Sequence, residues 1–291
     1  MAATHISTPS VLKRLLLKAR VTLSQKTLVN NPYLVGKFFP YKPDQIFYLL
    51  DKSNKNGRER SGLPIPPEHL RKVSSGESDE VFINSGKDCV DKMQNILSAS
   101  GFAIQPGIRV LDFGCGAGRV IRWFYDVADG CEMWGADISA EHIIWLQRHL
   151  SPPFRFVTIT ATPHLPFEDR YFDLIFCFSV FTHIDDLADT WLLEMKRILK
   201  PGGRLYITIQ DKNSFQKHMN QNWFLPDLLR AYDKTEMMSK RDYSMFTIGR
   251  GHQSQVFYDM NYLQQHWGCI LDVVSVTQAA YGDQTAILLK K

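Results

Sequence analysis

Apolar and polar residues follow two different rhythms through the central part of the chain. Short apolar runs, typical of buried strands, occur at residues 109–113, 131–136, 154–159, 172–178 and 204–209. Stretches with apolar residues at helical spacing occur at residues 85–100, 119–128, 139–150 and 185–199. From residue 109 onward strands and helices therefore alternate, and such alternation requires a parallel sheet with helices on both faces. The sequence predicts a doubly wound α/β domain.

We expect this domain to occupy residues 85–291 and to follow an N-terminal basic arm and extension at residues 1–84. Within the arm, residues 11–23 combine apolar and basic side chains at helical spacing. Three interpretations remain open: a helix packed on the main domain, an amphipathic helix in peripheral contact with an anionic membrane, or an organelle transit peptide.

Composition narrows the class of protein. With 44% hydrophobic residues in 291, the chain can bury a core, and extensive disorder is excluded. Residues 1–43 contain seven basic and no acidic side chains, so the remainder carries 27 basic and 30 acidic ones, a net charge of −3. This balance argues against a nucleic-acid-binding body.

The cysteines and the longest apolar runs indicate the compartment. Five widely spaced cysteines without a CxxC pair fit reduced thiols, and no tight His/Cys spacing indicates a metal site. No apolar run approaches the ~18–20 residues that cross a bilayer. We therefore expect a cytoplasmic protein without a bound metal.

A glycine-rich loop lies between the first strand and the next helical stretch. Gly114, Gly116 and Gly118 lack side chains, so their backbone can approach a ligand closely, and the start of a helix favours an anionic group. Arg119 occupies the place where a dinucleotide-binding fingerprint requires glycine or alanine. Asp112, just before the loop, suits an ammonium group better than a pyrophosphate. The loop therefore predicts a zwitterionic ligand.

Asp137 ends the next strand, 25 residues after Asp112. A carboxylate there can accept hydrogen bonds from both hydroxyls of a ribose. The alternative is that Asp137 caps the helix that begins near Ser139. The glycine loop upstream favours the ribose.

Taken together, these motifs resemble the donor-binding signature of class I S-adenosylmethionine-dependent methyltransferases. The signature is carried by Val110-Leu111-Asp112-Phe113-Gly114-Cys115-Gly116-Ala117-Gly118 with Asp137. Three further segments agree: Leu165-Pro166-Phe167 with Tyr171-Phe172-Asp173, Phe178-Ser179-Val180-Phe181-Thr182-His183, and Leu199-Lys200-Pro201-Gly202-Gly203. The resemblance implies a mostly parallel seven-stranded sheet whose last strand, at residues 283–289, is antiparallel.

The resemblance also implies roles for individual residues. The three glycines would surround the methionine part of S-adenosylmethionine, Asp112 would bind its amino group, Asp137 its ribose, and Ile138 would pack on the adenine. The remaining expected donor contacts are Phe113, Cys115, Thr160, Ala161, Thr162, Phe178 and Ser179. Where the family often has an acidic or amide residue on the adenine side, this chain has Thr160-Ala161-Thr162, so a hydroxyl or backbone group must serve there.

The carboxyl end of the strand at residues 172–178 should face the methyl group that is transferred. His183 is the candidate general base in that run; the alternative is that Thr182 begins a capping box and His183 lies in the first turn of a helix. Residues 213–258 interrupt the pattern before the last strands and are rich in aromatic side chains, so we expect an acceptor-side insertion or lid. Arg241, Arg250 and His252 could meet an acidic acceptor, or could be solvated surface charges.

The resulting hypothesis is a methyltransferase that transfers a methyl group by in-line displacement to the oxygen or nitrogen of a small-molecule or sugar-type acceptor. Two alternatives remain: a catalytically silent donor-binding scaffold, and a nucleotide-dependent oxidoreductase, which Arg119 and Asp112 disfavour. The negative body and the absence of an Asn/Asp-Pro-Pro-aromatic tetrad after Phe178 argue against methylation of a nucleic-acid base.

Overall fold

The structure is a computed structural model that describes residues 62–71, 78–184, 187–220, 243–248 and 254–291. The predicted amphipathic segment at residues 11–23, and the side chains of Arg241, Arg250 and His252, lie outside these residues. Within the described ranges, no helix combines the length and the apolar character that crossing a bilayer requires.

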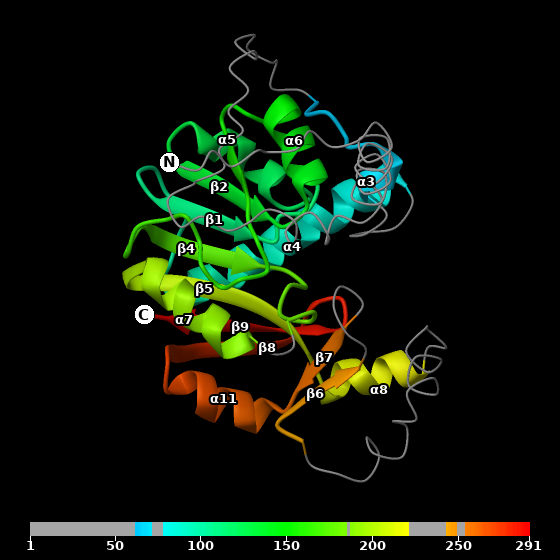
Figure 1. The fold of residues 1–291 in the computed structure, drawn as a ribbon, viewed down its shortest axis with the longest axis vertical. Coiled ribbons are helices and arrows are strands. Elements are labelled where there is room, and N and C mark those ends of the chain that lie inside the picture. Colours follow the sequence, from blue (N-terminus) through cyan, green and yellow to red (C-terminus); the bar gives the residue numbers. More distant parts are fainter. Residues whose placement is uncertain (1–61, 72–77, 185–186, 221–242, 249–253) are drawn as a thin grey trace, which may run out of the picture.

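One mixed sheet forms the centre of the molecule (Figure 1). Its strands are β1 (Arg109–Phe113), β2 (Glu132–Asp137), β3 (Arg155–Thr158), β4 (Phe172–Cys177), β5 (Leu199–Asp211), β6 (Met245–Ile248), β7 (Gln255–Tyr258), β8 (Asp272–Tyr281) and β9 (Gln284–Lys290). The order β3-β2-β1-β4-β5 is parallel throughout. This confirms the predicted doubly wound α/β fold, but within the described residues the sheet has nine strands rather than the seven that the resemblance implies.

β9 is the antiparallel strand that the resemblance implied. It lies between β5 and β8 and is antiparallel to both, with Ile207 of β5 opposite Ile287 of β9. β8 consequently runs in the direction of β5, and its carboxyl end lies at the same edge of the sheet. β7 pairs with only the last two residues of β5, Gln210 and Asp211. β6 pairs antiparallel with β7 and forms the edge of the sheet.

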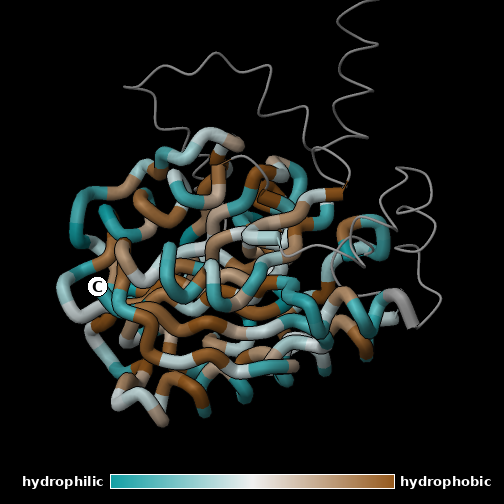
Figure 2. The backbone as a smooth tube through the Cα atoms, turned by 90° about the horizontal axis from the view of Figure 1, so that it is seen from below, coloured by the Kyte–Doolittle hydropathy of each residue, from teal (hydrophilic) through white to brown (hydrophobic). Residues whose placement is uncertain are grey.

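Helices cover both faces of this sheet. They are α3 (Glu68–Arg71), α4 (Asp79–Ala99), the 3-10 turn η1 (Ile121–Phe124), α5 (Tyr125–Ala128), α6 (Ala140–His149), α7 (Ala188–Ile198), α8 (Lys212–Asn220) and α11 (Met260–Gly268). Along β4, Leu174 and Phe176 pack with α4, η1 and α6, whereas Ile175 and Cys177 pack with α7 and α11. This alternation gives three layers, with hydrophobic strands inside and polar segments outside (Figure 2).

Two predicted helices differ from the structure. The predicted helix at residues 119–128 is wrong in its first half, where a turn and η1 precede the short α5. The N–H of Trp123 bonds to the carbonyl of Val120, and this tight turn buries Val120, Ile121 and Phe124 together. The helix predicted at residues 185–199 begins only at Ala188.

Candidate active site

The predicted site residues come together at the carboxyl edge of the parallel strands. β1, β2 and β4 run side by side and end at this edge (Figure 1). The turn between β8 and β9 reaches the same edge, because β8 runs parallel to β5. In open α/β sheets, ligands bind at the carboxyl ends of the strands, beside the point where the strand order reverses. Here that point lies between β1 and β4.

The glycine loop is fixed by backbone hydrogen bonds to β2. The N–H groups of Gly114 and Cys115 both donate to the carbonyl of Ala136, at 2.7 and 3.1 Å. A Cβ on Gly114 would lie 2.3 Å from Cγ2 of Val180, whereas a Cβ on Gly116 would meet no atom within 4 Å. Gly114 is therefore required for packing, and Gly116 leaves the space beside the loop open.

Asp137 connects this loop to the next helix. Its Oδ2 accepts a hydrogen bond from the N–H of Gly116 at 2.7 Å, and its Oδ1 accepts one from the N–H of Ser139 at 2.8 Å. The N-cap of α6 is Ser139, whose Oγ accepts from the N–H of His142, so the alternative role of Asp137 as the cap is wrong. Each carboxylate oxygen retains a further lone pair, as binding two ribose hydroxyls requires.

Asp112 is a buried carboxyl group with an unsatisfied oxygen. The residue is 3% exposed, and its Oδ2 has no hydrogen-bond partner. Burial raises the pKa of this carboxyl well above its usual range and Asp137 adds to the effect, while nearby Arg119 and the N–H of Ile121 oppose it. An ammonium group beside Oδ2 would supply the missing donor and favour the charged carboxylate.

The end of β4 carries a network of polar side chains. Ser179 has a φ of 56°, a left-handed conformation that is strained for a residue with a side chain and is found preferentially at functional sites. Its N–H donates to Oγ1 of Thr208, and its Oγ accepts from Nε2 of Gln284 at 2.6 Å. Oγ1 of Thr208 in turn donates to Oε1 of Gln284 at 2.7 Å. Gln284, at the start of β9, thus holds Ser179 in this conformation.

The expected adenine side follows β3. Thr160, Ala161 and Thr162 come directly after this strand, with Ala161 and Thr162 exposed, and the N–H of Ile159 donates to the carbonyl of Asp137. Ile138 is half-buried against the hydrophobic core on the α7 side of the sheet. These residues therefore lie beside Asp137 at the carboxyl edge.

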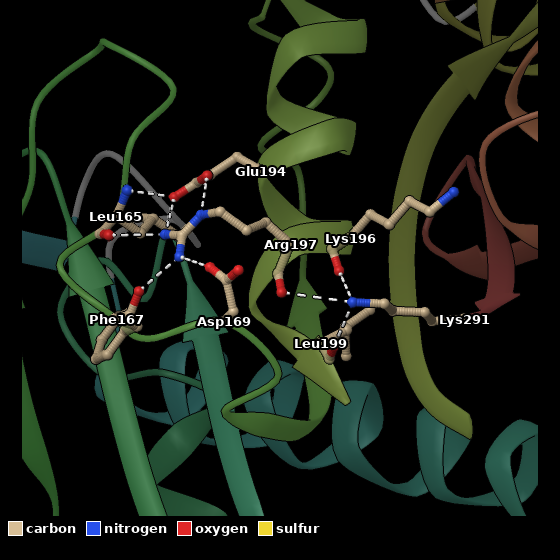
Figure 3. A network of polar contacts seen from close by, with 8 residues as sticks. All are labelled: Leu165, Phe167, Asp169, Glu194, Lys196, Arg197, Leu199 and Lys291. Carbon is tan, nitrogen blue, oxygen red and sulfur yellow. Dashed lines mark hydrogen bonds and ion pairs between the residues drawn. The ribbon is translucent and has the colours of Figure 1, made fainter. Parts of the chain in front are cut away.

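An ion pair between the half-buried Arg197 and the buried Glu194 anchors the segment after these threonines (Figure 3). Arg197 of α7 pairs with Glu194 at 2.7 Å and donates to the carbonyls of Leu165 and Phe167 and to the carboxylate of Asp169. Glu194 accepts from the N–H of Leu165 at 2.6 Å. The Leu-Pro-Phe motif is thus held against α7, and this contact fixes where the preceding segment can lie.

Three of the expected donor contacts have side chains in the hydrophobic core. Phe113 lies against Trp191 with ring centroids 4.8 Å apart, and Phe178 packs against Tyr206 at 5.3 Å. Cys115 is 6% exposed, and burial raises the pKa of its thiol well above its usual value. Any contact of these residues with a ligand at the edge of the sheet would come from the backbone.

His183 does not begin a helix, so the predicted capping box at Thr182 is wrong. Oγ1 of Thr182 instead donates to the carbonyl of Ser179 at 2.8 Å. His183 is exposed, and its Nδ1 lies 2.7 Å from the carbonyl of Ser254, while Oγ of Ser254 donates back to the carbonyl of His183. Because a carbonyl only accepts, Nδ1 carries the proton, and Nε2 is the basic nitrogen of the neutral ring.

His142 is a neighbour of Asp137 that was not among the site residues predicted from the sequence. His142 of α6 is 7% exposed; its Nε2 lies 3.1 Å from the carbonyl of Leu70 in α3, and its Nδ1 lies 4.0 Å from Oδ1 of Asp137. Burial alone would lower the pKa of His142, but Asp137 and the Leu70 carbonyl outweigh it and raise the pKa. Leu70 also packs on Ala117 of the glycine loop. α3 therefore contacts both the glycine loop and His142, which lies beside Asp137.

The groups at this edge fit the donor implied by the sequence. A buried carboxyl oxygen without a donor, a carboxylate at the end of β2 and an open glycine lie around one loop. Among the described residues, no group of three or more His, Cys, Asp or Glu side chains could hold a metal ion.

The central part of the chain is similar to known methyltransferases. Residues 111–207 match the family model for a methyltransferase domain. A ubiquinone/menaquinone biosynthesis C-methyltransferase UbiE from Laribacter hongkongensis is 36% identical over 117 residues, which cover 38% of this chain and 46% of that protein. Sterol 24-C-methyltransferase erg6 from Schizosaccharomyces pombe is 29% identical over 158 residues, covering 49% of this chain and 41% of that protein.

Similarity to solved structures concerns the fold. The PH0226 protein from Pyrococcus horikoshii superimposes with a TM-score of 0.50 at 16% identity, over 76% of this chain and 94% of that one. The chain spans about half the length, or less, of the two curated relatives named above. Residues 111–207 are thus similar to methyltransferase domains, in agreement with the resemblance of the glycine loop and Asp137 to class I S-adenosylmethionine-dependent methyltransferases.

Proposed function

We propose that this protein transfers the methyl group of S-adenosylmethionine to a small-molecule acceptor. The observation that carries the proposal is the unsatisfied, buried Oδ2 of Asp112 beside the glycine loop and Asp137. A buried carboxylate oxygen without a hydrogen-bond donor is costly, and the ammonium group of the donor would supply the hydrogen bond that Oδ2 lacks. A loop that binds a nicotinamide dinucleotide, or that binds no ligand, would have no use for an unpaired carboxylate oxygen at this position.

The binding roles follow from these positions. Asp112 would hold the ammonium group, Asp137 would accept hydrogen bonds from the ribose hydroxyls, and the open side of Gly116 would admit the methionine part. Ile138 would pack on the adenine, with the hydroxyl or backbone groups of Thr160 to Thr162 at its edge.

When bound, the donor would supply a methyl group on a sulfonium; the acceptor would attack its carbon in line, and the sulfur would leave with the bonding electrons as the neutral thioether of S-adenosylhomocysteine. The protein contributes the alignment of the acceptor and the exclusion of water, which solvates a concentrated charge better than a dispersed one. Ser179 and Val180, at the end of β4, would line the acceptor side. Residues 213–258 would cover it, and Ser254 connects this segment to the loop after β4 through His183.

His183 is the proposed general base for an acceptor that must lose a proton. The carbonyl of Ser254 fixes Nδ1 as the protonated nitrogen, so that Nε2 is the atom that could accept the proton. Replacing His183 with glutamine should lower kcat by about 100-fold or more at neutral pH and leave KM for the donor unchanged. An unchanged kcat would remove the base role without affecting donor binding.

The acceptor is proposed to be a small molecule, with a sugar-type hydroxyl or an amine as the first candidates. The two relatives named above are C-methyltransferases by name, so a carbon acceptor belongs in the same screen. The net charge of −3 outside residues 1–43 disfavours nucleic acid as the acceptor.

The test is methyl transfer from a labelled donor. Purified protein would be incubated with donor labelled on the methyl group and pools of small hydroxyl, amine and activated-carbon compounds, and both products would be measured by mass spectrometry. Stoichiometric formation of S-adenosylhomocysteine and a methylated product supports the proposal. Donor binding without transfer to any pool would favour the alternative, a catalytically silent donor-binding scaffold.

A further inference from the structure

His142 of α6 lies between Asp137 and α3, and the proposed function does not yet use it. Its ring is buried, with Nε2 3.1 Å from the carbonyl of Leu70 and Nδ1 4.0 Å from Oδ1 of Asp137. The distance to Oδ1 exceeds that of a hydrogen bond, and among the described residues Nδ1 has no hydrogen-bond partner. A buried titratable nitrogen thus faces the carboxylate that is proposed to bind the ribose.

The carbonyl of Leu70 determines which nitrogen of the neutral ring carries the proton. Because a carbonyl only accepts hydrogen bonds, Nε2 is protonated and donates to it. In the neutral ring Nδ1 therefore presents a lone pair to the carboxylate of Asp137, and two acceptors cannot bond to each other. In the protonated ring Nδ1 becomes a donor, and a movement of about 1 Å would bring it within hydrogen-bond distance of Oδ1.

Protonated His142 would compete with the donor for Asp137. Oδ1 of Asp137 already accepts a hydrogen bond from the N–H of Ser139, and Oδ2 accepts one from the N–H of Gly116. Each oxygen can accept one more, which the proposed function assigns to a ribose hydroxyl. A hydrogen bond from Nδ1 would occupy that remaining position on Oδ1, whereas neutral His142 leaves it open.

The surroundings of His142 favour its protonated form in the free protein. Burial lowers the pKa of His142, but Asp137 on β2, the Leu70 carbonyl and Glu141 on α6 outweigh burial and raise the pKa. A buried imidazolium beside Asp137 is therefore accessible near neutral pH.

α3 carries two more charged side chains on the helix that His142 contacts. His69 lies 3.3 Å from the carboxylate of Glu141, and Arg71 pairs with Asp79 of α4 at 2.6 Å. Both cations contact carboxylates other than Asp137. Since His69 is itself titratable, it has to be separated from His142 by experiment.

We propose that donor binding is coupled to proton release from His142: the donor binds the protein whose His142 is neutral, and the proton leaves Nδ1 for the solvent. This inference rests on the proposed function, because the group that competes with Nδ1 is the ribose of the donor. His142 is then a positioning residue that acts through Asp137, and the affinity for the donor falls as the pH falls. By reciprocity, the bound donor lowers the pH at which His142 takes up its proton.

The first measurement needs no variant. NMR would follow the ring resonances of His142, assigned through its backbone, between about pH 5.5 and 8.5 in the free protein and at saturation with S-adenosylhomocysteine. Protonation of His142 should weaken binding about 10-fold or more, the equivalent of one hydrogen bond to a charged group. The bound ligand should therefore lower the midpoint of the His142 titration by about one pH unit or more.

Calorimetry measures the same coupling as a change in affinity. Kd for S-adenosylhomocysteine would be compared at about pH 6 and about pH 8.5 in the wild type and in His142→Gln, whose amide can still donate to Leu70. Acidification should raise Kd of the wild type at least about fivefold more than Kd of the variant. Titration of Asp112 can also change the affinity, but it does so in both proteins. A purely structural role of His142 would instead raise Kd of the variant equally at both pH values.

His69→Gln is the matched control. The side chain of His69 is 64% exposed, so its replacement should leave the fold intact, and it removes a titratable group from α3 while His142 remains. This variant should keep the pH dependence of the wild type.

The outcomes are distinguishable. A His142 midpoint that S-adenosylhomocysteine leaves unchanged would overturn the inference and leave the proposed function intact, as would equal pH dependence in the wild type and His142→Gln. Loss of the pH dependence in His69→Gln would also overturn it, because the effect would then belong to His69. If His142→Gln does not fold, the NMR titration of the wild type decides alone. If S-adenosylhomocysteine binds the wild type at no pH in this range, the proposed function itself fails, and this inference with it.

Discussion

The substitution Asp137→Asn tests the carboxylate that holds the glycine loop and that we propose binds the ribose of the donor. In the wild type, the two oxygens of Asp137 accept hydrogen bonds from the N–H groups of Gly116 and Ser139, at 2.7 and 2.8 Å. An asparagine has one oxygen, so its NH₂ group must face one of these two N–H donors. A hydrogen bond to a charged group contributes about 1.5–3 kcal/mol, so we expect Asp137→Asn to lower the free energy of unfolding by about 2 kcal/mol.

The same substitution removes an acceptor for a ribose hydroxyl. We expect Kd for S-adenosylhomocysteine to rise about 10- to 150-fold, the equivalent of one charge-assisted hydrogen bond. Urea unfolding would measure stability, and calorimetry would measure Kd at a temperature where both proteins are folded.

A second aspartate provides the control for the Asp137 experiment. Oδ2 of Asp173 accepts from the N–H of Arg109 at 2.8 Å and from Nζ of Lys200 at 2.6 Å, at the start of β1 and β4, the opposite edge of the sheet. Asp173→Asn should reduce stability and leave Kd unchanged. If Asp137→Asn is destabilised but binds S-adenosylhomocysteine as tightly as the wild type, the ribose role is refuted.

Three further predictions concern packing and charge around the site. Gly114→Ala places a Cβ 2.3 Å from a side chain at a φ of +75° and should cost about 2–4 kcal/mol in urea unfolding, whereas Gly116→Ala, with open space, should cost about 1 kcal/mol. Arg197→Met leaves the carboxylate of Glu194 buried without its partner and should cost about 2–4 kcal/mol, part of which Glu194→Gln in the same protein should restore. Because the folded-state pKa of His142 is raised, its protonation stabilises the fold at low pH; the difference in unfolding free energy between wild type and His142→Gln should be largest below about pH 6.5 and shrink as pH rises, and a difference independent of pH would contradict this.

Local sequence patterns were sufficient to predict the framework of the fold. The first five strands and the glycine loop were predicted because each depends on a run of apolar residues or on glycines within a few positions. The antiparallel β9 was predicted only from the resemblance to a known family. The start of α7 was misplaced, because Thr182 bonds to the carbonyl of Ser179 rather than capping a helix. A threonine hydroxyl can either accept a hydrogen bond as a helix cap or donate one to a nearby carbonyl, so the sequence alone does not decide between the two.

Contacts between distant segments could not be predicted in this way. The bond between His142 and Leu70 joins residues 72 positions apart, and that between Ser179 and Gln284 joins residues 105 positions apart. No periodicity within either segment indicates its partner. Arg119 was recognised only as a departure from the dinucleotide fingerprint; its burial beside Tyr281 depends on the hairpin formed by the last two strands.

The central claim is that the loop after β1 and the acid after β2 bind an adenosyl-linked sulfur compound. Calorimetric titration of the wild type with S-adenosylhomocysteine, and in parallel with a reduced nicotinamide dinucleotide, tests it most directly. The account predicts saturable binding of S-adenosylhomocysteine at one site per chain and no heat of binding from the dinucleotide. A flat trace with S-adenosylhomocysteine, or saturation with the dinucleotide instead, would contradict it.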